Sequence, residues 1–79
     1  MKIQILGSGC AKCRQLEANA REAVAAGNVP ATVEKVTDLD AIMNMGVMMT
    51  PALAVDGVVK SAGKVLAKDE IARILQGGR

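Results

Sequence analysis

Two cysteines, Cys10 and Cys13, are the residues of this chain best suited to chemistry. Their spacing places the two sulfurs about one helical turn apart, so that they can share a disulfide bond or a soft metal ion. The 79-residue chain contains no histidine, which excludes His-based acid–base catalysis, His-containing metal sites and nucleophilic triads that use histidine. The cysteine pair is therefore the candidate reactive centre, with redox exchange and metal binding as its two chemistries.

The sequence around the pair predicts two thiols of different character. Cys10 follows Gly7-Ser8-Gly9 at the opening of a predicted helix, where unpaired N–H groups and the helix dipole favour a thiolate. Lys12 adds a positive charge, so the pKa of Cys10 is expected to fall from about 8.5 toward about 7 or below. Cys13 shares the apolar helix face with Leu16 and is predicted to be buried. An exposed attacking thiolate beside a buried resolving thiol suits thiol–disulfide exchange.

The composition excludes several classes of partner. Phe, Tyr and Trp are absent, which removes the aromatic rings on which many nucleic-acid-binding proteins stack bases. The net charge is +2 and the charges are dispersed, so no basic run favours binding to nucleic acid. No apolar stretch reaches the about 18 residues of a membrane span, and the opening apolar run is too short for a signal peptide. We therefore predict a cytoplasmic protein with reduced thiols, which binds neither nucleic acid nor membrane.

Hydrophobic periodicity, β-branched runs and turn residues predict the elements that position the cysteines. In chain order these are a strand over 2–6, a helix from 13 to 27, a strand over 32–37, a helix from 39 to 46, strands over 51–55 and 58–61, and a helix from 67 to 77. Asp56-Gly57 favours a two-residue hairpin turn between the last two strands. We therefore predict a single domain over residues 1–79 with an α/β fold of order β-α-β-α-β-β-α, a four-stranded mixed sheet with helices on both faces.

Helix ends and one glycine add local expectations. Thr37 with Asp40 resembles a capping box at the start of the short helix, whose apolar side includes Leu39 and Met43. Ala67 stands where a Ser or Thr cap is expected for the last helix. Gly63 is expected to be needed for a positive φ or for tight packing.

Four methionines, Met43, Met45, Met48 and Met49, precede Thr50-Pro51. Because the chain has no aromatic ring, the first expectation is that they fill an aliphatic core. Alternatively, Met48 or Met49 offers a pliable apolar surface to partner proteins near the disulfide. Ligation of a soft metal by Met together with the two cysteines is a third alternative.

The order of the elements separates the two chemistries of the pair. Small β-α-β-β-α-β domains that carry Cu(I) also place Cys-x-x-Cys between their first strand and first helix, but they end on a strand, whereas this chain ends on a helix. A purely structural Cys10–Cys13 disulfide is disfavoured, because so short a loop contributes about 2 kcal/mol and the cytosol would reduce it. Redox exchange is thus favoured over a soft-metal carrier of Cu(I) type, with a redox-gated binding module as a third alternative.

The combination of a strand leading into Cys10-Ala11-Lys12-Cys13, Thr50-Pro51 at the start of a later strand, and a terminal hairpin and helix resembles the thioredoxin/glutaredoxin superfamily. The closest resemblance is to the small thioredoxin-like redox-active disulfide proteins of archaea and bacteria. It implies that Cys10 is the nucleophile and Cys13 the resolving thiol. It also implies a cis Thr50–Pro51 bond beside the disulfide, so that the Thr50 backbone pairs with an incoming peptide strand.

The resemblance further implies a thiol–disulfide oxidoreductase, a protein-disulfide reductase that forms a mixed disulfide with its target. Electrons then return from a separate, flavin-dependent reductase, and the protein itself is a monomer with no cofactor. Contact with the target is assigned to four residues, namely Thr50, Pro51, Met49 and Lys12.

The chain departs from the family pattern next to both cysteines. Ala11-Lys12 replaces the Gly-Pro of typical thioredoxins, and Gly9 replaces the aromatic residue before the first cysteine. Gln4 stands where a buried acid usually helps to deprotonate the second cysteine, although Lys35 matches the lysine that accompanies that acid. Activation of Cys10 is therefore expected from the helix terminus, the backbone and Lys12.

Overall fold

The structure is a computed structural model that describes residues 1–9 and 11–77. Within these ranges the elements are β1 (Lys2–Leu6), α1 (Ala11–Gly27), β2 (Thr32–Val36), α2 (Leu39–Asn44), β3 (Ala52–Val55), β4 (Val58–Ala62) and α3 (Lys68–Gly77). This order is the predicted one. The longest helix, α1, has 17 residues, and no helix in the described part of the chain is long and apolar enough to cross a membrane.

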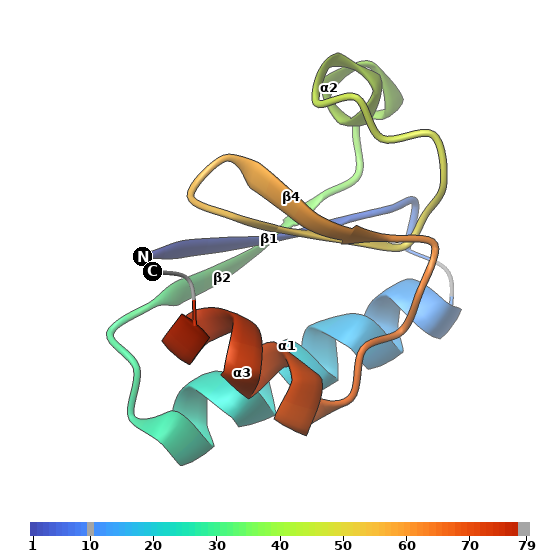
Figure 1. Ribbon diagram of the computed structural model, residues 1–79. Helices are drawn as coiled ribbons and strands as arrows, with labels where there is room; N and C mark the ends of the chain where they lie inside the picture. Colours follow the sequence, from blue (N-terminus) through green and yellow to red (C-terminus); the bar gives the residue numbers. More distant parts are fainter. Residues whose placement is uncertain (10, 78–79) are drawn as a thin grey trace.

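The described strands form one four-stranded sheet in the order β2-β1-β3-β4. β1 runs parallel to β2 and antiparallel to β3, and β4 pairs antiparallel with β3. Helices α1 and α3 pack together on one face of the sheet, and α2 lies on the other face (Figure 1). The predicted mixed sheet with helices on both faces is therefore confirmed.

The alternation of side chains along the central strands fills two apolar clusters, one on each face. Ile3 and Ile5 of β1 lie on the face covered by α1 and α3, where Leu16 and Ile71 complete the cluster. The side chains of Gln4 and Leu6, which alternate with them along β1, point to the opposite face. Leu6 therefore belongs to the smaller cluster under α2, and its partners there are Ile42, Val47, Ala52 and Ala54.

The hairpin turn between β3 and β4 is as predicted. Asp56 has φ 51° and Gly57 has φ 84°, and positive φ at both central residues is what a type I′ turn requires. The Asp56 carboxylate also accepts a hydrogen bond from the Lys2 N–H at 2.8 Å, while the Asp56 N–H donates to the Lys2 carbonyl at 2.8 Å. The turn is thereby joined to the beginning of β1.

The prediction that Thr37 and Asp40 form a capping box at the start of α2 is wrong. Asp38 is the N-cap, and its side chain accepts a hydrogen bond from the Asp40 N–H at 3.1 Å. Ile42 is buried, but Leu39 and Met43 are 62% and 68% exposed. Because α2 has only six residues, it packs on the sheet through Ile42. Leu39 and Met43, an i,i+4 pair, face solvent.

The start of α3 carries half of a capping box. The Ala67 carbonyl accepts the first helical hydrogen bond from the Ile71 N–H at 3.0 Å, and the Glu70 carboxylate accepts one from the Ala67 N–H at 3.1 Å. Ala67 is therefore at the N-cap position, where its side chain cannot bond to the free N–H groups of the first turn.

The substitution Ala67→Ser should raise the free energy of unfolding by about 1 kcal/mol, because a serine hydroxyl accepts one of those N–H groups. This corresponds to a midpoint about 4–8 °C higher in thermal denaturation. The matched control is Ala18→Ser at an exposed position inside α1, which should be slightly destabilising because serine favours helix less than alanine. A loss of stability in both variants would contradict the assignment of Ala67 as the N-cap.

Candidate active site

Cys13 lies in the first turn of α1 and is buried, with 5% of its surface exposed. Its neighbour is Gly7, directly after β1: a Cβ on Gly7 would overlap the Sγ of Cys13. The Gly7 N–H donates a hydrogen bond to the Val36 carbonyl at 3.0 Å, which holds this backbone against β2. The thiol therefore rests directly on the end of the central strand. Cys10 lies outside the described residues.

The Thr50–Pro51 segment, directly before β3, lies near the same glycine. The peptide bond between the two residues is cis, the isomer that the family resemblance implies. A Cβ on Gly7 would lie 3.7 Å from the Cβ of Thr50, so one glycine contacts both Cys13 and Thr50. Pro51 is fully buried and Thr50 is exposed. Gly7 was expected only as part of the segment before Cys10, and its close approach to Cys13 and Thr50 was missed.

Met49 lies at the exposed rim of the site and packs on Gly63. It is 63% exposed, and a Cβ on Gly63 would lie 3.2 Å from its Cε and 3.3 Å from its Cβ. Gly63 has φ 79°, so both a positive φ and tight packing are confirmed there. The Gly63 N–H donates to the Pro51 carbonyl at 2.8 Å. Met49, Pro51 and Gly63 thus form one contact group next to Thr50.

The expectation that the methionines fill the core is wrong for Met43, Met48 and Met49, whose exposed fractions are 68%, 92% and 63%. It holds for Met45, which is half-buried against the cluster under α2. The physical reason is that other aliphatic side chains, among them Leu6, Ile42 and Val47, already fill the cluster under α2. Met48 and Met49 are therefore exposed apolar residues directly before Thr50 in the chain.

Lys12 is exposed in the first turn of α1. It therefore belongs to the helix side of the site, next to Cys13 in the chain. Thr50 and Met49 belong to the loop that precedes β3. The structure brings Cys13 and Thr50 together at Gly7, and Pro51 follows Thr50 in the chain. No contact of Lys12 with these described residues is observed.

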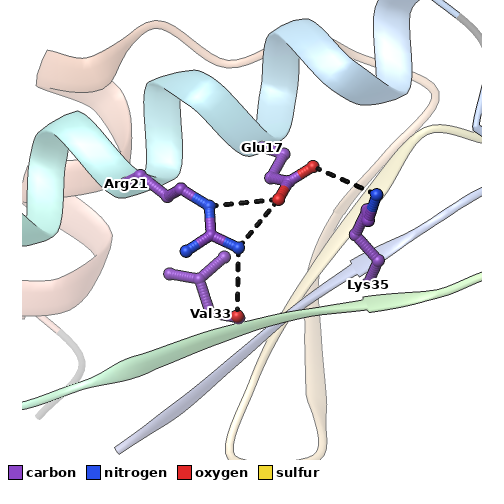
Figure 2. Close-up of polar contacts among 4 residues, drawn as sticks. All are labelled: Glu17, Arg21, Val33 and Lys35. Carbon is purple, nitrogen blue, oxygen red and sulfur yellow. Dashed lines mark hydrogen bonds and ion pairs between the residues drawn. The ribbon is translucent and has the colours of Figure 1, made fainter.

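An ion-pair group joins the cysteine-bearing helix to the sheet (Figure 2). The Glu17 carboxylate accepts hydrogen bonds from Nε and Nη2 of Arg21 at 3.0 and 2.8 Å, and its other oxygen lies 4.0 Å from Lys35 Nζ. Arg21 Nη2 also donates to the Val33 carbonyl at 3.5 Å. Because Glu17 and Arg21 belong to α1 while Val33 and Lys35 belong to β2, these contacts help to hold the helix that carries Cys13 in place.

Lys35 and Gln4 lie on opposite faces of the sheet. The register of β1 and β2 places Gln4 opposite Glu34, and Ile5 opposite Lys35. The Gln4 amide donates to the Glu34 carboxylate at 3.0 Å. Since neighbouring side chains in a strand point to opposite faces, Lys35 lies on the face of α1, where it meets Glu17, and not on the face of Gln4.

Comparison with known proteins supplies the family. A family model described as a thioredoxin domain matches residues 1–76. A thioredoxin of Methanothermobacter thermautotrophicus is 51% identical over 75 residues, which cover 95% of this chain and 97% of the relative. A thioredoxin of Methanocaldococcus jannaschii is 39% identical over 69 residues, with 87% and 79% of the two chains covered.

These matches to thioredoxins give no support to the soft-metal carrier. Proteins of this family act on disulfide-containing targets and receive electrons from a reductase. The chain belongs to the thioredoxin domain family and is a thiol–disulfide oxidoreductase, a disulfide reductase and electron carrier of thioredoxin type.

Proposed function

We propose that Cys10 and Cys13 carry out this reaction as nucleophile and resolving thiol. The Cys10 thiolate attacks one sulfur of a target disulfide, and the other target sulfur leaves as a thiolate. The Cys13 thiolate then attacks the Cys10 sulfur of the mixed disulfide. This second step releases the fully reduced target and leaves a Cys10–Cys13 disulfide. A separate, flavin-dependent reductase returns the two electrons.

The observation that carries this proposal is the contact of Gly7 with both Cys13 and Thr50. A thiol that is 5% exposed is poorly placed to attack a large target itself. It is well placed to attack a disulfide formed by its close neighbour in the chain, since Cys10 lies three residues earlier. Burial of Cys13 and the proximity of the Thr50 segment together support the division of roles.

The target is proposed to bind across Thr50, Pro51, Met49 and Lys12. Thr50 is exposed beside Cys13, so its backbone is available to pair with an extended target strand, a form of β-augmentation. Met49 adds an adaptable apolar contact next to it. Lys12 adds a positive charge on the helix side, which attracts acidic groups of a partner.

We further propose that residues 1–79 form a single domain that works as a cytoplasmic monomer without a cofactor of its own. The proposed exchange uses two thiols of the same chain, so it needs no second copy. A cytoplasmic location would keep both thiols reduced and ready for reaction.

A trapping experiment tests the assignment of the two cysteines. Reduced Cys13→Ser protein, mixed with insulin as a disulfide-containing probe, should form a covalent one-to-one adduct because the resolving thiol is missing. Non-reducing electrophoresis and mass spectrometry detect the adduct, and dithiothreitol should dissolve it. The matched control, Cys10→Ser, keeps the buried Cys13 and should form little adduct. Equal capture by both variants, or capture by Cys10→Ser alone, would overturn the assigned roles.

A further inference from the structure

Met49 is an exposed residue with an oxidisable thioether beside the candidate active site. Met48 and Met49 are 92% and 63% exposed and immediately precede Thr50. The mechanism proposed above uses Met49 only as an apolar contact. A methionine sulfur that solvent reaches is also open to oxidants such as hydrogen peroxide.

Met49 differs from Met48 in what its sulfur contacts. A Cβ on Gly63 would lie 3.6 Å from the Met49 Sδ and 3.2 Å from its Cε, so the side chain lies flat against this glycine. Gly63 in turn donates its N–H to the Pro51 carbonyl at 2.8 Å. The thioether of Met49 therefore covers the backbone junction that holds Pro51, next to Thr50.

Oxidation changes this contact in a defined way. Hydrogen peroxide transfers one oxygen atom to Sδ: an S–O bond forms, the O–O bond breaks, the sulfur loses two electrons and water is released. The sulfoxide is polar and larger than the thioether. With Gly63 in close contact, the added oxygen requires either movement of the side chain or a polar group within the apolar surface.

We propose that Met49 is an oxidation site through which hydrogen peroxide weakens the docking of protein disulfides and leaves the thiol chemistry intact. The inference rests on the proposed function, because it takes Met49 to be part of the target-binding surface. Met48 provides the contrast: it is more exposed, so its sulfur should be oxidised at least as readily, but it is not the residue that covers Gly63.

The test uses the protein with its cysteines joined as a disulfide, which shields them from peroxide. After treatment with hydrogen peroxide, peptide mass spectrometry gives the extent of oxidation at each methionine. The kcat/KM for dithiothreitol-driven reduction is then measured with insulin and with a small aromatic disulfide, and each protein is compared with its own untreated sample. The amide signal of Gly63 in NMR reports the local contact independently of activity.

For the wild-type chain, oxidation should lower kcat/KM for insulin by about three- to ten-fold, the loss expected for one good contact, with no change for the small disulfide. The Met49→Leu variant should resist this loss, whereas Met48→Leu should show it in full, and the Gly63 signal should shift only where Met49 is oxidised. Full insulin activity with Met49 oxidised, or equal protection by both variants, would overturn this inference and leave the proposed function standing. If the untreated protein reduces neither substrate, both the proposed function and this inference are overturned.

Discussion

Replacing Cys10 by serine should lower the rate of dithiothreitol-driven insulin reduction to that of dithiothreitol alone, a loss of about 100-fold or more. A serine hydroxyl does not ionise near neutral pH and does not attack a disulfide sulfur. A cysteine thiol ionises far more readily, and the resulting thiolate attacks disulfide sulfur. Turbidity of the released insulin chain, followed over time, measures the rate. Because Cys10 carries the first step of the proposed mechanism, no other single substitution is expected to reduce turnover as much.

Ser8→Ala is the matched control, since Ser8 is an exposed neighbour just before the cysteine pair. This variant should keep the wild-type rate. Full activity in Cys10→Ser together with loss in Cys13→Ser would reverse the two roles. If Cys10→Ser retains activity but loses a soft metal that purifies with the wild type in near-equal amount, the Cys pair is a metal site rather than a redox centre.

The substitution Gly7→Ala should lower both stability and activity. The added Cβ would overlap the Cys13 sulfur and lie 3.7 Å from Thr50 Cβ, in a place where the backbone is bound to Val36. Overpacking of this kind costs about 1–3 kcal/mol of unfolding free energy. A displacement of Cys13 of about 1 Å is also enough to lower kcat/KM by about 10-fold or more. Urea denaturation and insulin reduction, both at a temperature where the variant is folded, give the two values.

Gly46→Ala separates this steric effect from a general glycine effect. Gly46 has φ 80°, and a Cβ there would meet no atom within 4 Å. The control variant should therefore lose about 1 kcal/mol through its left-handed backbone conformation, with kcat/KM unchanged. Wild-type stability and activity in Gly7→Ala would show that the close contact with Cys13 and Thr50 is not what requires a glycine.

Local sequence patterns predicted those features that depend on near neighbours in the chain. The Asp56-Gly57 pair carries the backbone preferences of its own turn, and the turn is present with positive φ at both residues. Helical spacing places Cys13 on the side of Leu16, and both are buried. In each case the determining interactions join residues a few positions apart, so the local sequence is sufficient to predict the feature.

The predictions that failed depend on space shared between distant segments. Met48 and Met49 were first expected in a core that lacks aromatic rings, with an exposed contact surface as the alternative, and both are exposed. Leu6, Ile42 and Val47 already fill the volume under α2. The choice among apolar residues follows from shape and volume in the folded chain. Lys35 matched a family lysine by resemblance, but its position relative to Gln4 was not predictable, and only the register of the two strands showed that the two side chains lie on opposite faces.

The sequence by itself determined the chemistry: two cysteines at helical spacing, no histidine, and an order of strands and helices that ends on a helix. These features are set by the covalent chain or by interactions between near neighbours, so they do not depend on contacts between distant segments. Only the tertiary structure decided what surrounds the buried thiol. Thr50 meets Cys13 at Gly7 although it lies far from both in the chain. The three can approach because glycine has a hydrogen atom where any other residue would place a Cβ.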